Sequence, residues 1–173
     1  MNKEKSIAKE QVLDAAFEII RKEGYPVLST RKIAQQLGCS TQMIYKWYGT
    51  MDELKKDVVA KITDYLKTII YSFYKTGNPF LDVEMGYVYT AHAEPLLFKF
   101  IYIDNSLSVK LTDVIKDRRI VSVIRKDFRM ASYRKNQKTV LDNWVYVHGL
   151  AVLIVSGVIA YDEDKIEKML SNF

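Results

Sequence analysis

Apolar residues recur at the spacing of one helix face along almost the whole chain, and polar residues fill the positions between them. No segment alternates apolar and polar residues between hairpin turns, as half-buried strands do. Glycine and proline interrupt the helical pattern, and the first interruption, at Gly24 and Pro26, ends a helix over residues 6–23. The pattern therefore predicts an all-α protein of about nine helices.

The other predicted helices are separated by similar breaks. They span residues 30–37, 41–48, 50–75, 79–93, 96–103, 108–129, 133–160 and 162–170. Ser29 or Thr30 is expected to cap the second helix, and the hydroxyl of Ser40 is expected to cap the third. Thr50 and Glu53 have capping-box spacing before the fourth helix, whose long apolar stripe would link two domains.

Residues 29–48, STRKIAQQLGCSTQMIYKWY, have the pattern of two short helices joined by a tight turn. Ile33 and Ala34 form the apolar face of the first helix, and Ile44 holds the second from inside. Gly38 supplies the left-handed backbone conformation that the turn requires. The outer face of the second helix is then polar and basic, and such a helix fits the major groove of DNA, about 12 Å wide. The segment predicts a helix-turn-helix DNA-binding unit.

This stretch, continuing into GTMDELKKDVV, resembles the tetracycline-repressor (TetR) family, whose N-terminal signature is T-x-R-x-I-A-x-x-x-G-x-S-x-x-x-x-Y-x-x-F followed by K-x-x-L. The matching positions are Arg31, Ile33, Ala34, Gly38, Ser40, Tyr45 and Leu54, with conservative changes at Ser29 and Tyr48. The sequence departs from the family at Met51, where lysine is usual, and at Gln42, where a small residue is common. The resemblance implies a DNA-binding domain over residues 1–50 and a helical effector-binding and dimerisation domain over residues 51–173.

The resemblance also implies how the unit would hold DNA. Tyr45 would contact a backbone phosphate, as would Ser29 and Thr30 at the positive N-terminus of their helix. Lys46 is interpreted as a further phosphate contact, and Lys55 lies one turn beyond the position of the missing lysine, whose charge it can replace.

Bases would be read by Thr41 and Gln42, because glutamine can bond adenine through two atoms and threonine offers a hydroxyl and a methyl group. The complete set expected to contact DNA is Ser29, Thr30, Arg31, Ser40, Thr41, Gln42, Met43, Tyr45, Lys46, Tyr48 and Lys55. Trp47 is interpreted as a core residue, as large aromatic side chains usually are, and Cys39 as a small turn residue.

The C-terminal half is rich in aromatic residues, which suits either an effector cavity or an ordinary core. The effector candidates lie on helices that enclose the ligand in the family, although packing is the simpler interpretation of each: Tyr65, Met85, Tyr89, His92, Trp144 and His148. Small residues at Gly149, Ala151 and Gly157, followed by Ile166, favour close helix approach and a homodimer. Residues 143–161 lack charge, but polar interruptions favour a buried helix over a membrane span.

Charge favours a polyanionic partner, since the net charge is +5 and the isoelectric point is about 9.1. Part of this charge lies on the predicted helix 108–129, which is interpreted as a solvated face, with nucleic acid, an anionic effector or a membrane surface as alternatives. The single cysteine excludes an internal disulfide, and no Cys/His cluster has metal-ligand spacing. We therefore expect a cytoplasmic protein without metal or cofactor.

These features together predict a regulator that binds a palindromic operator in double-stranded DNA as a homodimer and is released by a small-molecule effector. The alternative is a DNA-binding regulator controlled by a protein partner or by its own abundance. An enzyme is disfavoured, because the sequence has no recognisable nucleophile–base pair, paired carboxylates, phosphate-binding glycine loop or metal set.

Overall fold

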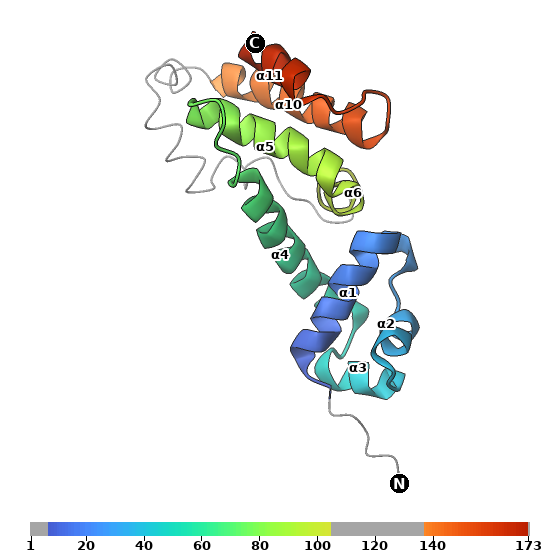
Figure 1. The fold of residues 1–173 in the computed structure, drawn as a ribbon. Coiled ribbons are helices and arrows are strands. Elements are labelled where there is room, and N and C mark those ends of the chain that lie inside the picture. The colour runs from blue at the N-terminus through green and yellow to red at the C-terminus, as the bar shows by residue number, and fades with distance from the viewer. Residues whose placement is uncertain (1–6, 105–136, 173) are drawn as a thin grey trace. The chain divides into compact units, whose positions relative to one another are not determined.

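The computed structural model describes residues 7–104 and 137–172. Within these ranges the chain forms eight α-helices and one short 3-10 helix, with no strand (Figure 1). The predicted all-α fold is confirmed, whereas the predicted basic helix at 108–129 lies outside the described residues. Among the described helices, none combines the length and the apolarity needed to span a bilayer.

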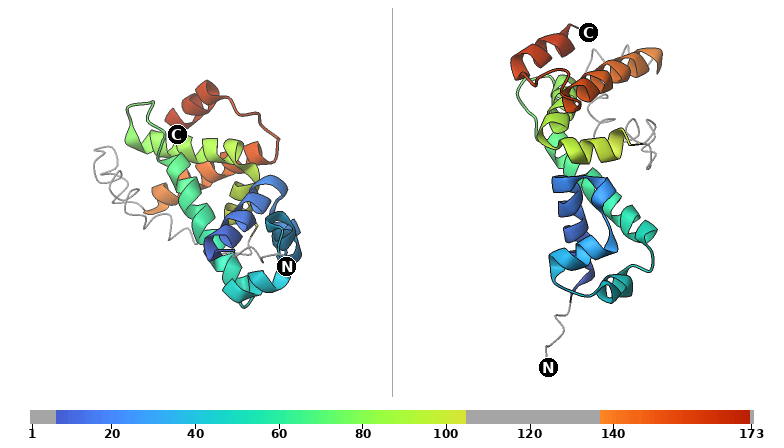
Figure 2. Two further views of the ribbon diagram at one scale, coloured as in Figure 1. Left: turned by 60° about the horizontal axis from the view of Figure 1, so that its bottom comes forward. Right: turned by 90° about the vertical axis from the view of Figure 1, so that its right-hand side faces the viewer.

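The chain divides into two compact units, Met1–Tyr65 and Leu66–Phe173. The first unit holds α1 (Lys9–Glu23), the 3-10 helix η1 (Tyr25–Val27), α2 (Thr30–Leu37), α3 (Thr41–Trp47) and most of α4 (Met51–Ile70). The helices α1, α2 and α3 pack around a small apolar core, and two further views of them are given in Figure 2. The fully buried side chains of this core include Val12, Ile20, Ile33, Ile44, Leu54, Val58 and Ile62.

Most predicted helix ends of the first unit are confirmed. The hydroxyl of Ser29 caps α2 by accepting from the backbone N–H of Lys32 at 3.2 Å, and Gly24 ends α1 with a φ of 86°. Ser40 is the N-cap residue of α3, as predicted. The predicted hydrogen bond from its hydroxyl group is wrong, because the side chain makes no capping hydrogen bond. Its backbone carbonyl accepts from Met43 at 3.1 Å instead.

The second unit is built around α5 (Pro79–Ala93). This helix packs against α10 (Gln137–Val155), α11 (Glu163–Ser171) and α6 (Pro95–Tyr102), as Figure 1 shows. The largest fully buried side chains there are supplied by α5 and α6, and Ile166 and Leu170 attach α11 to the same core. Because α5 is covered on several sides, most of its residues are buried, which explains its weak separation of polar and apolar faces.

The connection between α4 and α5 is fixed by the buried carboxylate of Asp82. One of its oxygens accepts hydrogen bonds from the backbone N–H of Lys75 at 3.1 Å and from the backbone N–H and hydroxyl of Thr76 at 2.9 and 2.8 Å. Asn78 caps α5 by accepting from Phe80 at 3.1 Å. The prediction that α4 continues to residue 75 is therefore wrong, since these loop atoms bond to Asp82 rather than to a helix.

The helix α10 is also shorter than predicted at its end. It stops at Val155 rather than at residue 160, because Gly157 takes a φ of 74° and turns the chain out of the helix. The backbone N–H groups of Val158 and Ile159 both donate to the carbonyl of Leu153, at 2.9 and 3.1 Å. This turn leads to Asp162, whose carboxylate caps α11.

Gly86 permits a close approach between two helices of the second unit. A Cβ atom at this position would lie 2.2 Å from the carbonyl oxygen of Ile70, the last residue of α4. Gly149, in α10, is the contrasting case, because a Cβ atom there would meet nothing within 4 Å. The end of α4 can therefore rest directly on the backbone of α5 only while residue 86 lacks a side chain.

Replacing Gly86 by alanine should lower the free energy of unfolding by about 1–3 kcal/mol, because backbone rather than a flexible side chain must move. The matched variant Gly149→Ala should leave stability unchanged or raise it by up to about 1 kcal/mol, since alanine is the better helix former. Thermal and urea denaturation followed by circular dichroism measure both. Equal stability of the two variants would contradict the close approach.

Candidate nucleic-acid interface

The turn between α2 and α3 has the geometry that the sequence predicts. Gly38 adopts the left-handed conformation, with φ 65° and ψ 40°, and its N–H bonds back to the last turn of α2. The N–H of Cys39 then donates to the carbonyl of Ala34 at 3.0 Å, which closes the helix end. Ile44 is fully buried and holds α3 against this support. The turn and this apolar anchor thus hold the start and the inner face of α3.

The outward face of α3 carries the side chains that the sequence analysis assigned to DNA. Thr41, Gln42, Tyr45 and Lys46 are exposed, and Met43 is half-buried. Tyr45 is 51% exposed although it is a large aromatic residue. An exposed helical face of hydroxyl, amide and ammonium groups can bond phosphate oxygens and base edges without rearrangement of the core.

The side chain of Thr30, the first residue of α2, contacts one residue of α3 and one residue of α4. Its hydroxyl lies 3.3 Å from the Tyr45 hydroxyl and donates to the sulfur of Met51 at 3.5 Å. Threonine has one hydroxyl proton, so donation to Met51 leaves the Tyr45 hydroxyl as the donor in the other contact. The methionine that replaces the lysine usual in the resembled family is therefore part of a contact that joins the first residue of α2, the outer face of α3 and the first residue of α4.

The basic residues near this face have different surroundings. Arg31, in the first turn of α2, and Lys46 are exposed. Lys32 is paired with Glu23 at 2.8 Å. Lys55 is half-buried, with its ammonium nitrogen 4.9 Å from the centroid of the Tyr25 ring. Lys55, which the sequence analysis assigned to replace the missing lysine, thus makes a cation–π contact with Tyr25.

Tyr48 differs from the other predicted contact residues, because only 3% of its surface is exposed. Its hydroxyl donates to the carboxylate of Asp57 at 3.1 Å, and the same oxygen pairs with the ammonium group of Lys9 at 2.9 Å. These contacts lower the pKa of Asp57, while burial and the bond to Asp57 raise the pKa of Tyr48 well above its ordinary value. Tyr48 joins the end of α3 to α1 and α4.

The interpretation of Trp47 as a core residue is wrong. The side chain is 40% exposed, and its indole N–H donates to the carbonyl of Ile7 at 2.7 Å. The neighbouring Tyr48 takes the buried position instead, because the extended backbone after α3 turns residue 48 inwards. Trp47 therefore attaches the segment before α1 to the end of α3.

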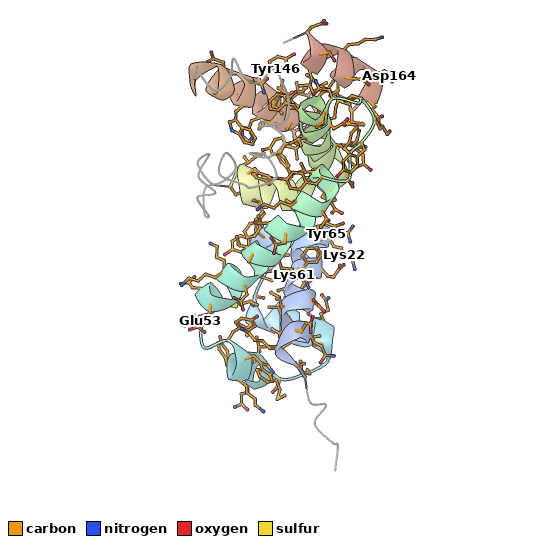
Figure 3. The ribbon with its side chains drawn as sticks, turned by 90° about the vertical axis from the view of Figure 1, so that its left-hand side faces the viewer. Lys22, Glu53, Lys61, Tyr65, Tyr146 and Asp164 are labelled. Atoms are coloured by element: carbon orange, nitrogen blue, oxygen red, sulfur yellow. The ribbon has the colours of Figure 1, made fainter. Side chains whose placement is uncertain are left out.

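The six effector candidates do not form one group. Tyr65 belongs to the first unit, where its ring packs edge-on against Phe17 at 5.3 Å; Figure 3 labels it on α4 near Lys61. Met85 is a fully buried core residue. The remaining four divide between two aromatic groups of the second unit.

The first aromatic group centres on Tyr87, which the sequence analysis did not single out. The Tyr87 ring lies 5.0 Å from the ring of Trp144 and 5.3 Å from that of Tyr102, and its hydroxyl is 2.9 Å from Nδ1 of His148. Burial lowers the pKa of His148, so the imidazole is neutral at neutral pH. Recognising Tyr87 required the pairing of α5 with α10, which periodicity does not reveal.

The second aromatic group contains Tyr89, His92 and Tyr161. The rings of His92 and Tyr161 are stacked at 4.6 Å, and Tyr89 lies 5.6 Å from Tyr161. The Tyr161 hydroxyl is buried without a hydrogen-bond partner among the described residues, and burial raises its pKa to about 12. This group lies between α5 and the start of α11.

A buried polar pair between α5 and α10 was also missed. The amide nitrogen of Asn143 donates to the carboxylate of Glu84, and both side chains are buried. Burial raises the pKa of Glu84 to about 7, although the hydrogen bond from the Asn143 side chain acts to lower it. In the parts of the chain that the structure describes, no three His, Cys, Asp or Glu residues are grouped so that they could hold a metal ion.

The short α2, the left-handed turn and the exposed polar face of α3 define the first unit as a helix-turn-helix domain. Residues 12–58 match the family model described as bacterial regulatory proteins, tetR family. The match covers the helix-turn-helix domain, so this part of the chain is similar to the DNA-binding domain of the tetR family. No curated protein matches it.

A solved structure with a similar fold is that of a tetR-family transcriptional regulator from Streptomyces coelicolor. The two share 15% sequence identity with a TM-score of 0.63, over 94% of this chain and 76% of the other. At this identity the likeness shows the fold alone. The matched region includes the second unit as well as the DNA-binding domain.

The pKa of Asp57 predicts an acid-sensitive contribution to the stability of the helix-turn-helix domain. Because folding lowers this pKa, the unfolded chain binds more protons, and the stabilisation is present above the unfolded pKa of about 4. It is lost as the pH falls through the folded pKa. Asp57→Asn should therefore lower the thermal midpoint at pH 7, and the difference from the unaltered protein should shrink towards pH 3.

The matched control is Asp64→Asn, an exposed position on the same helix, which should change the midpoint little at either pH. Circular dichroism at 222 nm follows the transition of each protein. A difference for Asp57→Asn that stays constant between pH 7 and pH 3 would contradict the role of the ionised carboxylate.

Proposed function

We propose that this protein is a ligand-responsive repressor that binds a palindromic operator as a homodimer. DNA binding is assigned to residues 1–50, and effector binding and dimerisation to residues 51–173. The observation that carries the proposal is the exposed face of α3, where Thr41, Gln42 and Lys46 extend from a helix held by its buried side. Two such helices in a symmetric dimer would read two half-sites.

Within each half-site, the start of α2 provides the phosphate-binding end. The exposed Ser29 keeps its hydroxyl proton for a phosphate oxygen, since its oxygen accepts from Lys32. Arg31 and the positive end of the helix add favourable charge, and Tyr45 lies beside Thr30 at the same end. Gln42 and Thr41, on the first turn of α3, are the base-reading residues.

Tyr48 and Lys55 have indirect roles in this proposal. Tyr48 is buried against Asp57 and holds the end of α3 in place, rather than contacting DNA through its hydroxyl. Lys55 remains a long-range positive charge over Tyr25. Ser40 and Met43 lie at the start of α3, where the exposed Ser40 hydroxyl, unused in capping, can donate to DNA.

Effector control would act through α4, which supplies residues to both compact units. Its last residue, Ile70, rests on Gly86 of α5, and Asp82 fixes the loop that follows. Because these contacts join α4 closely to α5, a ligand that shifts α5 would also displace the end of α4. Release follows if the ligand favours a conformation with lower operator affinity.

The dimer would form through an apolar stripe on α10. Val145 is 61% exposed, and Val152 and Leu153 continue its face at helical spacing. The buried residues Ala151, Ile166 and Leu170 belong to the core of one chain and are not free to form the contact. A second copy of the chain is the occupant that matches the two-fold symmetry of an operator.

Three substitutions on the DNA face should have separable effects. Gln42→Ala should lose about 1–3 kcal/mol of discrimination at one base pair of each half-site. Tyr45→Phe removes the hydroxyl that bonds Thr30 at the phosphate-binding start of α2, and it should weaken binding to all sequences alike, because phosphate contacts carry no sequence information. Lys46→Ala should reduce the slope of log affinity against log salt by about 1 for each half-site.

The assay selects bound sequences from a random DNA pool and titrates salt on the enriched one. Lys22→Ala is the charge control, because it lies about 20 Å along α1 from Lys9, at the end away from α3. It should preserve both sequence preference and salt slope. Selection without an enriched palindrome would contradict the proposed operator, and unchanged binding by all three variants would remove α3 from the interface.

Dimer formation is tested with Val145→Glu, which places a charge on the α10 stripe. Sedimentation velocity at micromolar concentration should show a dimer for the unaltered protein and a monomer for the variant. Operator affinity should fall at least about tenfold, since the two half-sites are no longer bound together. Tyr74→Glu, at an exposed aromatic residue outside α10, should remain dimeric. A dimeric Val145→Glu protein would exclude this face.

A further inference from the structure

Two hydroxyl groups and one sulfur atom form a short series of hydrogen bonds beside the start of α2. The Tyr45 hydroxyl lies 3.3 Å from the Thr30 hydroxyl, which in turn lies 3.5 Å from the sulfur of Met51. The three residues belong to α3, α2 and α4 in that order. Each of the three side chains is exposed or half-buried. We call these three side chains the Thr30 network.

The sulfur atom fixes the direction of both hydroxyl protons in the Thr30 network. A thioether has no proton and can only accept, so the single hydroxyl proton of Thr30 points to Met51. The hydroxyl proton of Tyr45 must then point to the oxygen of Thr30. Both protons are therefore used inside the network in the protein without DNA.

A phosphate oxygen that binds here must take over one of the two protons, because it accepts hydrogen bonds and does not donate them. Taking the Tyr45 proton breaks a bond between two oxygen atoms. Taking the Thr30 proton breaks only a bond to a thioether sulfur, which is a weak acceptor. Tyr45 then still donates to Thr30, and the hydrogen bond that a hydroxyl group accepts strengthens the one that it donates. The exchange at Thr30 is therefore the less costly of the two.

We propose that Thr30 donates the phosphate hydrogen bond, that Tyr45 strengthens this bond by donating to Thr30, and that the Met51 sulfur holds the Thr30 proton until a phosphate replaces it. Thr30 is then the contact residue, and Tyr45 and Met51 are positioning residues. This inference rests on the proposed operator binding and assigns roles within its phosphate contacts. A direct phosphate contact by Tyr45, which the resemblance implies, is the alternative that the experiment separates.

The residue at position 51 decides how the network behaves. Lysine, which is usual here in the resembled family, donates hydrogen bonds and cannot accept them, so it could not hold the Thr30 proton. Methionine accepts weakly and carries no charge. The network therefore acts through hydroxyl groups alone, and its substitution should not alter the salt dependence of operator binding.

The role of Thr30 is tested by fluorescence anisotropy with the enriched operator and the full-length protein. Thr30→Val keeps the branched shape but removes the hydroxyl, and operator affinity should fall at least about tenfold. Thr30→Ser restores a hydroxyl and should keep the affinity within about twofold of the unaltered protein. The slope of log affinity against log salt should be the same for all three proteins. Unchanged affinity in Thr30→Val would overturn the assignment of the contact residue.

A double-mutant cycle separates an indirect role of Tyr45 from direct contact. Tyr45→Phe alone should lower operator affinity about threefold or more, because the Thr30 hydroxyl loses its donor. In the Thr30→Val protein the same substitution should change the affinity by less than about twofold, since no hydroxyl is left to strengthen. Losses that add in the double variant would show a direct phosphate contact by Tyr45 and overturn the proposed roles.

The role of Met51 is tested with Met51→Leu, which has a similar volume but no acceptor. Operator affinity should rise about two- to fivefold, because a phosphate no longer displaces the bond to sulfur. The rise should be absent in the Thr30→Val protein. Met169→Leu, the same substitution at a half-buried residue of α11, should leave the affinity unchanged. An unchanged or lower affinity of Met51→Leu, or a rise that persists in Thr30→Val, would exclude the proposed role of the sulfur.

Operator binding by the unaltered protein separates this inference from the proposed function. Sequence-specific binding with independent effects of the three substitutions would overturn the Thr30 network and leave the DNA-binding proposal in place. Coupled effects with an unchanged salt slope would support both. A folded protein that enriches no operator sequence would contradict both.

Discussion

The apolar stripe of α4 is the constraint on which both halves of this protein depend. Five buried residues follow one another at intervals of four along this helix: Leu54, Val58, Ile62, Leu66 and Ile70. Because an α-helix needs only 3.6 residues for a turn, a spacing of four rotates the stripe by about 40° at each step. The stripe winds by about 160° over the helix, so one flat neighbour cannot cover it. Its first residues complete the helix-turn-helix core and its last residue enters the core around α5.

Polar contacts then fix the ends that the apolar stripe leaves undetermined. In the first unit, Asp57 bonds Tyr48 and Lys9, which ties α4 to the end of α3 and the start of α1. In the second, Asp82 gathers the N–H groups of the loop after α4, and Gly86 allows backbone contact with Ile70. Both carboxylates lie where a helix meets its neighbours. A ligand that moves α5 would therefore also move the end of α4, because the two helices are in close contact.

Two aspects of the second unit are difficult to explain by stability alone. Among the described residues, the buried Glu84 is paired with the amide of Asn143, and Trp144, which follows Asn143, is half-buried. An apolar pair at the positions of Glu84 and Asn143 would pack α5 against α10 without the cost of burying a carboxylate.

The fold class, most helix ends and the polar outer face of α3 could be predicted from the amino-acid sequence. These features are local: Gly38 takes the left-handed conformation because of its own backbone, and the exposure of Gln42 and burial of Ile44 follow from helical periodicity. The burial of Tyr48 and the exposure of Trp47 could not be predicted in this way, since periodicity alone does not say how the chain leaves a helix. The packing also sets the end of α4 at Ile70 and assigns Tyr65 to the first compact unit, whereas the other effector candidates belong to the second. Glu84, Asn143 and Tyr87 became recognisable only when α5 and α10 were paired, because residues about 60 positions apart carry no mutual signal in one sequence.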